Sequence, residues 1–328
     1  MSNTDLRFGI FVPQGWRMDL TNLGDDPREQ YAAMLRVAQL ADAEAVLDSV
    51  WLYDHLHTLP EPTQETTFEC WTTTAALARD TRRVRIGQMT TCNAFRHPSL
   101  LAKMASTVDV LSNGRLIVGL GAGWNDQEAT AYGIPFPDRR ERMVRFREAC
   151  EVLTLLWTTD RARYAGHYYR LEGAINRPRA VQQPHPPLWI AGGGEQVTLR
   201  LVARYGDACN VGGGSPELIR HKLEVLRRHC DQVGRDFAAI TRSTTVEELY
   251  IVSHEHEIPA ARERLLPTLP PALAATLVVD TPDHHAARLS ALAEAGANYL
   301  IVYLRQVAAE PDQVTRFAQE VVPRVQAR

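Results

Sequence analysis

The chain has 328 residues, of which 45% are hydrophobic and 23% charged, and its formal net charge is −3. This composition excludes a disordered chain, and the weak negative charge gives no electrostatic case for binding nucleic acid. No apolar run is long enough to cross a bilayer, and the first residues lack the basic and apolar regions of a signal peptide. We therefore expect a cytoplasmic protein with no membrane partner.

Apolar runs of strand length alternate with segments of helical periodicity along the chain. The apolar runs predict eight strands, at residues 8–12, 49–53, 84–89, 116–120, 188–191, 208–211, 245–252 and 299–304. Helical spacing predicts helices at residues 27–45, 68–79, 98–111, 138–157, 197–205, 216–233, 282–295 and 312–325. Residues 164–187 indicate an inserted hairpin and loop, and residues 257–276 are rich in proline and partly helical.

Eight strands that alternate with helices, without a break in composition, predict an α/β fold closed into a (β/α)8 TIM barrel with insertions. We expect residues 1–328 to form a single domain. A doubly wound parallel sheet is the alternative, and eight regular units make it the less favoured one. In such a barrel the chemistry lies at the carboxyl ends of the strands, so the candidate residues are those that directly follow a strand.

The cysteines and clustered histidines do not predict a metal site. Five distant cysteines without a C-x-x-C pair favour reduced thiols in the core over disulfides or structural zinc: Cys70, Cys92, Cys150, Cys209 and Cys230. The histidine-rich residues 253–257 and 284–285 lack the spacing of a zinc site, and HExxH is absent. We expect no metal.

The segment at residues 115–132, RLIVGLGAGWNDQEATAY, joins the fourth strand to a helix. Its glycines let the backbone approach a ligand closely, and Trp124, Asn125 and Glu128 follow at once. A strand, a glycine turn and a helix capped by Asn125 is the simpler interpretation. Trp124 also stands where the third glycine of a dinucleotide fingerprint would be, which argues against a nicotinamide site.

Polar residues follow the second and third strands as well. Asp54 and His55 come after the second strand, and Met89, Thr90 and Asn93 after the third. Histidine titrates near neutrality and can exchange protons at physiological pH, so His55 is a candidate general acid or base. A structural hydrogen bond to Asp54 or another neighbour is the alternative.

Two glycine triplets lead into helices after the fifth and sixth strands, at residues 192–194 and 212–214. Backbone N–H groups at the start of a helix form a phosphate site, and tight turns are the simpler interpretation. Together, the triplets favour a cofactor that carries phosphate.

The sequence RRERMVRFRE at residues 139–148 mixes arginine with glutamate on one face of a helix. Mixed charges of this kind are more typical of a solvated helix face than of an anion site. Aromatic residues near the predicted mouth could form a cup around a substrate or simply pack together; they are Trp16, Tyr53, Phe95, Trp124, Tyr132 and Phe136.

Several motifs, in combination and in order, resemble the bacterial luciferase-like superfamily, and within it the F420-dependent oxidoreductase branch. They are Asp54-His55, TTCNAFRHPSLLAKMASTVDVLSNGRL, GLGAGWNDQEATAYGIPF and HPPLWIAGGGEQVTLRLVARYGD. The likeness covers about residues 8–211, and the C-terminal third follows the family pattern loosely. The resemblance implies a TIM barrel with insertions, a homodimer, and coenzyme F420 as cofactor, with FMN in other branches.

The resemblance also implies where the cofactor lies. Asp54 and His55 would lie beside its ring system, and Met89-Thr90 falls where the family carries a non-proline cis peptide behind the ring. Asn93 belongs to the same strand end. Residues that would line or bind the phosphate side are Ala122, Gly123, Gly192, Gly193 and Gly194.

The implied reaction is hydride transfer between C5 of the deazaflavin ring of F420 and an unsaturated bond of a small-molecule substrate. His55 would supply or remove the accompanying proton. Trp124 stands where a relative that oxidises sugar phosphate carries an acidic catalytic residue. This difference puts sugar-phosphate oxidation in doubt and suggests a flatter, less polar substrate. Asn125 or Glu128 would then share the acid–base work.

Two other functions stay open from the sequence. An FMN-dependent monooxygenase on the same fold would use reduced flavin to activate dioxygen, which the deazaflavin does not readily do. A non-catalytic relative would keep the barrel as a binding or dimerisation module, although the Asp54-His55 pair and the glycine loops would then have no purpose.

Overall fold

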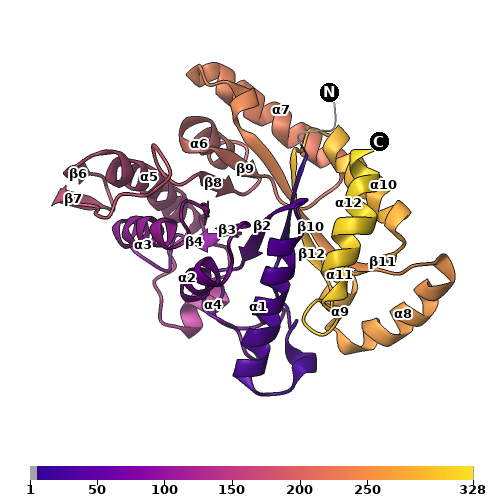
Figure 1. Cartoon of the computed structure of the whole chain (residues 1–328). Helices are drawn as coiled ribbons and strands as arrows, with labels where there is room; N and C mark the ends of the chain where they lie inside the picture. Colours follow the sequence, from indigo (N-terminus) through magenta and orange to yellow (C-terminus); the bar gives the residue numbers. More distant parts are fainter. Residues whose placement is uncertain (1–5, 328) are drawn as a thin grey trace.

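The computed structural model describes residues 6–327, which contain a closed barrel of eight parallel strands (Figure 1). The strands follow one another around the barrel in chain order: β1 (Arg7–Phe11), β2 (Leu47–Leu52), β3 (Arg85–Gln88), β5 (Leu116–Gly121), β8 (Leu188–Ala191), β9 (Ala208–Asn210), β10 (Thr241–Ile251) and β12 (Tyr299–Leu304). Pairing of β9 with β10 and of β12 with β1 closes the ring. The predicted TIM barrel is confirmed.

Helices surround the strands (Figure 1). They are α1 (Pro27–Ala43), α2 (Cys70–Asp80), α3 (Pro98–Leu111), α4 (Asp126–Ala131), α5 (Arg139–Thr158), α6 (Thr198–Tyr205), α7 (Pro216–Val233) and α10 (Pro282–Glu294). Proline in the first turn and a capping side chain before it explain several of the starts; at α1 and α7 the caps are Asp26 and Ser215. None of the helices in residues 6–327 is both long and apolar enough to span a bilayer.

The last helix differs from the single helix predicted at residues 312–325. It consists of α11 (Asp312–Arg316), a π-helical turn (Phe317–Val321) and α12 (Val322–Gln326). The apolar side chains still face the barrel, because Phe317, Val321 and Val322 are fully buried. The hydrophobic pattern thus predicts the buried face but not the change of hydrogen bonding within the helix.

Additional strands and helices are inserted between the barrel elements. The predicted hairpin is present as β6 (Ala162–Ala165) and β7 (Arg170–Ala174). A short β4 (Thr91–Cys92) pairs with β5, and β11 (Val278–Asp280), which was not predicted, pairs with β10. With α8 (Ile258–Leu265) and α9 (Pro271–Ala274), β11 encloses a small apolar cluster of its own.

The barrel interior is filled by aromatic side chains. Trp51, Trp189 and Tyr299 are almost fully buried, and the rings of Trp51 and Trp189 lie 4.9 Å apart. Because the interior is packed, it leaves space for a ligand only at the ends of the barrel, and enzymes of this fold use the carboxyl end.

Candidate functional site

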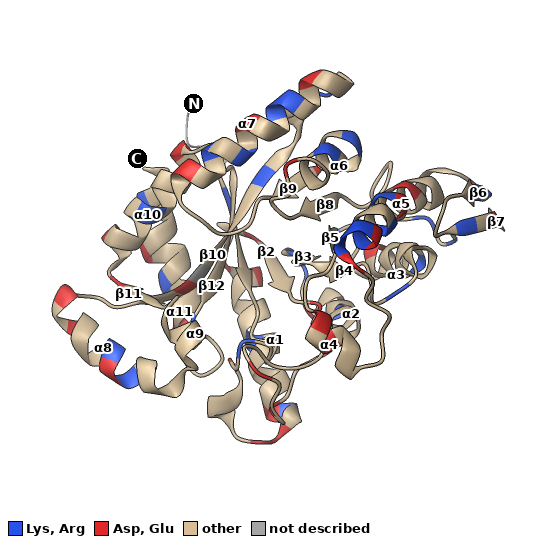
Figure 2. Cartoon of the chain, turned by 180° about the vertical axis from the view of Figure 1, so that it is seen from behind, with Lys and Arg blue, Asp and Glu red and all other residues tan. Residues whose placement is uncertain are grey.

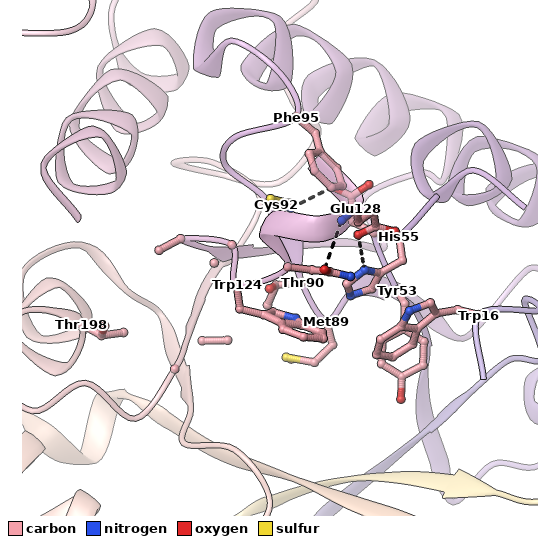
Figure 3. A pocket seen from close by; sticks show the side chains of 17 residues that line it. Trp16, Tyr53, His55, Met89, Thr90, Cys92, Phe95, Trp124, Glu128 and Thr198 are labelled. Atoms are coloured by element: carbon pink, nitrogen blue, oxygen red, sulfur yellow. Dashed lines mark hydrogen bonds and ion pairs between the residues drawn. The ribbon is translucent and has the colours of Figure 1, made fainter. Parts of the chain in front are cut away.

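A cavity of about 320 Å³ opens at the carboxyl ends of β2, β3, β5 and β8 (Figure 3). Ten of the thirteen site residues predicted from the sequence line it: Asp54, His55, Met89, Thr90, Ala122, Gly123, Trp124, Asn125, Glu128 and Gly192. The volume lies at the lower end of the range for small-molecule sites. Most of the residues predicted from their position after a strand therefore lie together at the carboxyl end of the barrel.

His55 is held by Glu128, which lies in the first turn of α4. His55 Nδ1 is 2.7 Å from Glu128 Oε2, and the Leu56 N–H donates to Glu128 Oε1 at 2.6 Å. Burial acts to raise the pKa of the Glu128 carboxyl, but the hydrogen bonds from His55 and Leu56 outweigh burial and hold this pKa below its ordinary value. The predicted structural bond of His55 is thus made to Glu128 and not to Asp54.

This pairing fixes the protonation pattern of His55. An ionised carboxylate can only accept a hydrogen bond, so Nδ1 carries a proton. In the described part of the chain Nε2 has no hydrogen-bond partner, and the ring lines the cavity. Nε2 is therefore the atom that can exchange a proton with a bound molecule.

Asp54 has a different role from His55. Arg96 Nη1 lies 2.5 Å from Asp54 Oδ2 and Arg96 Nη2 lies 3.1 Å from Oδ1, a two-pronged ion pair. The Cys92 N–H donates to Oδ2 at 2.8 Å. The buried carboxylate thereby anchors the loop after β4 beside the cavity.

Four of the six aromatic residues considered from the sequence form walls of the cavity: Trp16, Tyr53, Phe95 and Trp124. Trp16 stacks flat on His55, with ring centroids 4.1 Å apart and planes 1° from parallel, while Trp124 meets the same ring edge-on at 5.7 Å. Trp124 is 60% exposed. Tyr132 lies outside the cavity and donates to the Leu56 carbonyl.

The backbone around the cavity shows two features of a close ligand approach. The Met89–Thr90 peptide is cis, as the resemblance implies, and both residues line the cavity. Gly123 has φ +82°, and a Cβ there would lie 2.8 Å from Cys92 Sγ. Only glycine fits this turn beside Ala122.

The glycine loop after β8 differs in part from the prediction that all three of its amides face a phosphate. The Gly192 N–H donates to the Asn210 carbonyl at 2.9 Å, so it is already used. Within the described chain the N–H groups of Gly193 and Gly194 have no hydrogen-bond partner, so both can donate to an anion. The prediction holds for at most two of the three amides.

A groove of about 870 Å³ continues from this loop and is bordered by α5, with Thr198 lining both the groove and the cavity. Its charged lining residues are Arg139, Arg140, Arg147, Glu195 and Lys222. Lys222 pairs with Glu195 at 2.7 Å, whereas Arg139 and Arg140 are exposed and have no ion-pair partner in residues 6–327. Figure 2 shows the basic start of α5 close to α6. These arginines are solvated, as predicted, but they also border a groove that the sequence did not predict.

Asn93 is the predicted residue that the fold places elsewhere. It lines a second cavity, of about 520 Å³, that is separated from the first by Ala122 and also bordered by Phe136. Its side-chain amide lies 3.5 Å from the hydroxyl of Tyr169. Asn93 comes three residues after the cis peptide, and this position alone does not reveal that the chain turns away from the barrel mouth.

The sequence assigned no role in the site to Thr198 or Arg96. Thr198 starts α6 and lines the cavity, and Arg96 holds Asp54. Their only signal in the sequence is their position after a predicted strand, which many polar residues share. Which of these residues point inward depends on contacts between distant segments.

The sequence profile of the luciferase-like monooxygenase family matches residues 6–269. Among curated relatives, an F420-dependent glucose-6-phosphate dehydrogenase of Amycolatopsis mediterranei is 30% identical over 91% of this chain and 96% of its own length. The protein of the same name from Beutenbergia cavernae is also 30% identical, over 92% and 96%.

Solved structures share the fold at low sequence identity. An F420-dependent secondary alcohol dehydrogenase in complex with an F420-acetone adduct superimposes with a TM-score of 0.79 at 20% identity, covering 98% of this chain and 99% of its own. The EDTA monooxygenase of Chelativorans sp. BNC1 superimposes with a TM-score of 0.82 at 20% identity, covering 98% and 94%. Profile, relatives and fold agree, and the chain therefore belongs to the luciferase-like monooxygenase family.

Proposed function

We propose that this protein is an oxidoreductase that transfers a hydride between coenzyme F420 and an unsaturated bond, such as C=C or C=N, of a small-molecule substrate. The observation that carries the proposal is the His55–Glu128 pair on a cavity that leads past a glycine loop into a basic groove. The names of the relatives that are 30% identical over nearly the whole chain support F420 as the cofactor.

The basic groove favours F420 over FMN. FMN ends at its phosphate, whereas F420 continues beyond the phosphate into an acidic tail of lactate and glutamate. The free amides of Gly193 and Gly194 suit a phosphate, and Arg139 and Arg140 lie in the groove beyond them. An anion that ended at the glycine loop would leave both guanidinium groups unused.

The residues of the cavity divide the work between holding and proton transfer. F420, when bound, supplies the carbon that gives or accepts the hydride. His55 gives or takes the accompanying proton at Nε2, and Glu128 holds the ring in that orientation. Met89 and Thr90, which line the cavity, would help to hold the deazaflavin of F420. Asp54 anchors the neighbouring loop through Arg96.

Asn125 and Trp124 have supporting roles in this proposal. The Oδ1 atom of Asn125 accepts the Glu128 N–H at 3.2 Å and caps α4. This contact supports a structural role for Asn125, which is to position Glu128. We assign proton transfer to His55. Trp124 supplies an apolar wall beside the substrate.

The lining of the cavity argues for a substrate without phosphate. In the described chain no lysine or arginine lines it, whereas aromatic rings and Met89 do. A phosphate buried there would lack a lysine or arginine partner. We therefore propose a flat, weakly polar substrate and not the sugar phosphate in the names of the relatives.

A homodimer remains part of the proposal, as does a cytoplasmic location. Three large apolar side chains on α3 are exposed, Leu100, Val110 and Leu111, and Leu100 is 53% exposed. Burying these side chains against a second copy would remove apolar surface from water.

Titration with F420 and with FMN, followed by quenching of cofactor or tryptophan fluorescence, tests the cofactor. We expect F420 to bind more tightly than FMN, with an affinity that falls as salt is raised. Tighter binding of FMN would favour the monooxygenase. Binding of neither cofactor would favour a non-catalytic barrel.

A further inference from the structure

A buried ion cluster lies beside the barrel mouth and contributes no side chain to the cavity wall. Arg17 follows β1, Glu248 lies in β10, and Arg305 follows β12. Arg17 Nε is 2.8 Å from Glu248 Oε1, and Arg305 Nη1 is 3.6 Å from Glu248 Oε2. Each of the three residues is at most 5% exposed.

This cluster grips the loop that carries Trp16. The Arg305 guanidinium donates to the carbonyl of Arg17 at 3.0 Å and reaches that of Met18 at 3.4 Å. The Arg17 guanidinium itself lies 5.9 Å from the centre of the Trp16 ring. Glu248 therefore acts on the loop through two arginines. Arg305 holds the backbone that follows Trp16, and the side chain of Arg17 lies beside the Trp16 ring.

Asp19 closes the same loop from its other end. Its carboxylate accepts the Gly15 N–H at 2.6 Å and the Tyr303 hydroxyl at 2.5 Å. The Trp16 carbonyl accepts the Leu59 N–H, from the loop after β2, at 2.8 Å. The loop is thus fixed at every residue around Trp16.

Strained backbone is concentrated at this cluster. Met18 and Glu248 have φ +54° and +51°, and Gln306, next to Arg305, has φ +66°. Non-glycine residues seldom adopt positive φ, and they keep it only where the surroundings enforce it, often at functional sites.

The cluster is poorly suited to serve stability alone. Burial raises the pKa of Glu248 above its ordinary value, although the guanidinium groups of Arg305 and Arg17 act against the effect. Buried ion pairs often contribute little net stability, because removing charges from water offsets their attraction. A geometric role accounts better for three buried charges and a strained backbone.

We propose that the Arg17–Glu248–Arg305 cluster is a positioning device that holds Trp16 flat against His55. Trp16 covers one face of the imidazole at 4.1 Å, so a fixed Trp16 leaves the other face and Nε2 for ligands. The consequence for catalysis rests on the proposed function, but the positioning itself does not.

The test observes His55 in the protein without any cofactor. Histidine labelled with ¹³C at Cε1 gives one NMR signal per residue, and the variant His55→Gln identifies that of His55. The signal observed is that of Hε1, the proton bonded to the labelled Cε1. The ring current of an indole stacked flat on the imidazole shifts it upfield, and Trp16→Leu gives its position without the indole. We expect Glu248→Gln to move the signal from the wild-type position toward the Trp16→Leu position.

The double variant Trp16→Leu/Glu248→Gln shows whether the effect passes through Trp16. We expect its signal to coincide with that of Trp16→Leu. A Glu248→Gln signal that stays at the wild-type position would overturn the proposal, and so would a further shift in the double variant.

Two variants at Arg17 guard against loss of folding, which thermal melting monitors. Arg17→Gln leaves Glu248 beside Arg305 and should shift the His55 signal in the same direction as Glu248→Gln. Arg17→Lys should return the signal part of the way to the wild-type position. The matched control is Glu224→Gln, which removes an exposed carboxylate paired with Arg228 on α7 and should leave the signal unchanged. Because no cofactor is present, failure of F420 binding cannot be mistaken for failure of this proposal.

Discussion

Replacing Glu128 with glutamine is the sharpest perturbation of the proposed proton-transfer group. The carboxylate is fully buried and accepts hydrogen bonds from His55 at 2.7 Å and Leu56 at 2.6 Å. Glutamine has nearly the same shape and keeps one oxygen for the Leu56 N–H. Its amide N–H₂ would face His55 Nδ1, which favours the tautomer with the proton on Nε2.

The two expected effects have different magnitudes. Wrong placement of the proton should lower kcat by about 10²–10⁴-fold, the usual contribution of a general acid or base. Affinity for F420 should change by less than about threefold, because Glu128 does not border the groove. Loss of the charge-assisted bond should reduce the free energy of unfolding at pH 7 by about 1.5–3 kcal/mol.

The stability effect should depend on pH in a defined direction. The pKa of Glu128 is lowered in the folded protein, so its ionised form contributes stability above its ordinary pKa of about 4.5. That contribution is lost as the pH falls through the lowered folded value. In urea unfolding, the stability difference between wild type and Glu128→Gln should therefore begin to shrink below about pH 4.5 and vanish once the pH lies below the lowered folded value.

Three measurements check this reasoning: steady-state turnover with any compound found active, F420 fluorescence titration, and urea unfolding between neutral and acid pH. Glu172→Gln, which removes an exposed carboxylate of the hairpin, is the control and should match wild type. Unchanged turnover of Glu128→Gln, or a stability difference that persists at acid pH, would refute the assignment.

Three further predictions concern the groove, the thiols and the dimer. Arg139→Gln/Arg140→Gln should weaken F420 binding about threefold to thirtyfold in a fluorescence titration. The matched control is Arg36→Gln/Arg262→Gln, at two exposed arginines on α1 and α8, and it should bind F420 like wild type. Equal losses of affinity in the two double variants would exclude the groove as part of the F420 site. All five cysteines are buried, and burial raises the pKa of Cys92 to about 12. A thiol reagent near neutral pH should therefore modify none of them rapidly before unfolding, and rapid reaction of one would contradict this burial. Leu100→Glu should convert a wild-type dimer to monomers in sedimentation equilibrium, and a monomeric wild type would exclude the dimer.

The barrel was predictable because its signals are local. Strand-length apolar runs alternate with helical periods, and each pattern is set by burial on one or both faces. The strand β11 was missed because three residues between proline-rich turns give no periodicity. The predicted strand starts later than β10 because the first residues of β10, Thr241 to Thr244, are polar and give no apolar run, although their backbone pairs with β9.

The site was predictable only as far as the rule on strand ends reaches. That rule placed His55 and Glu128 at one mouth, but not in contact, since 73 residues separate them. Arg17 and Glu248 are 231 residues apart and gave no joint signal. The same limit explains Asn93, which follows the right strand but turns into the second cavity.

An anaerobic single turnover tests the central claim most directly. The protein is mixed with reduced F420 and a panel of imines, enones and nitroaromatics, and in the reverse direction with oxidised F420 and the saturated counterparts, while the deazaflavin absorbance is followed. We predict that at least one compound changes the redox state of F420 without dioxygen, and that His55→Ala slows this change while F420 still binds. Turnover only with reduced FMN and dioxygen would contradict it.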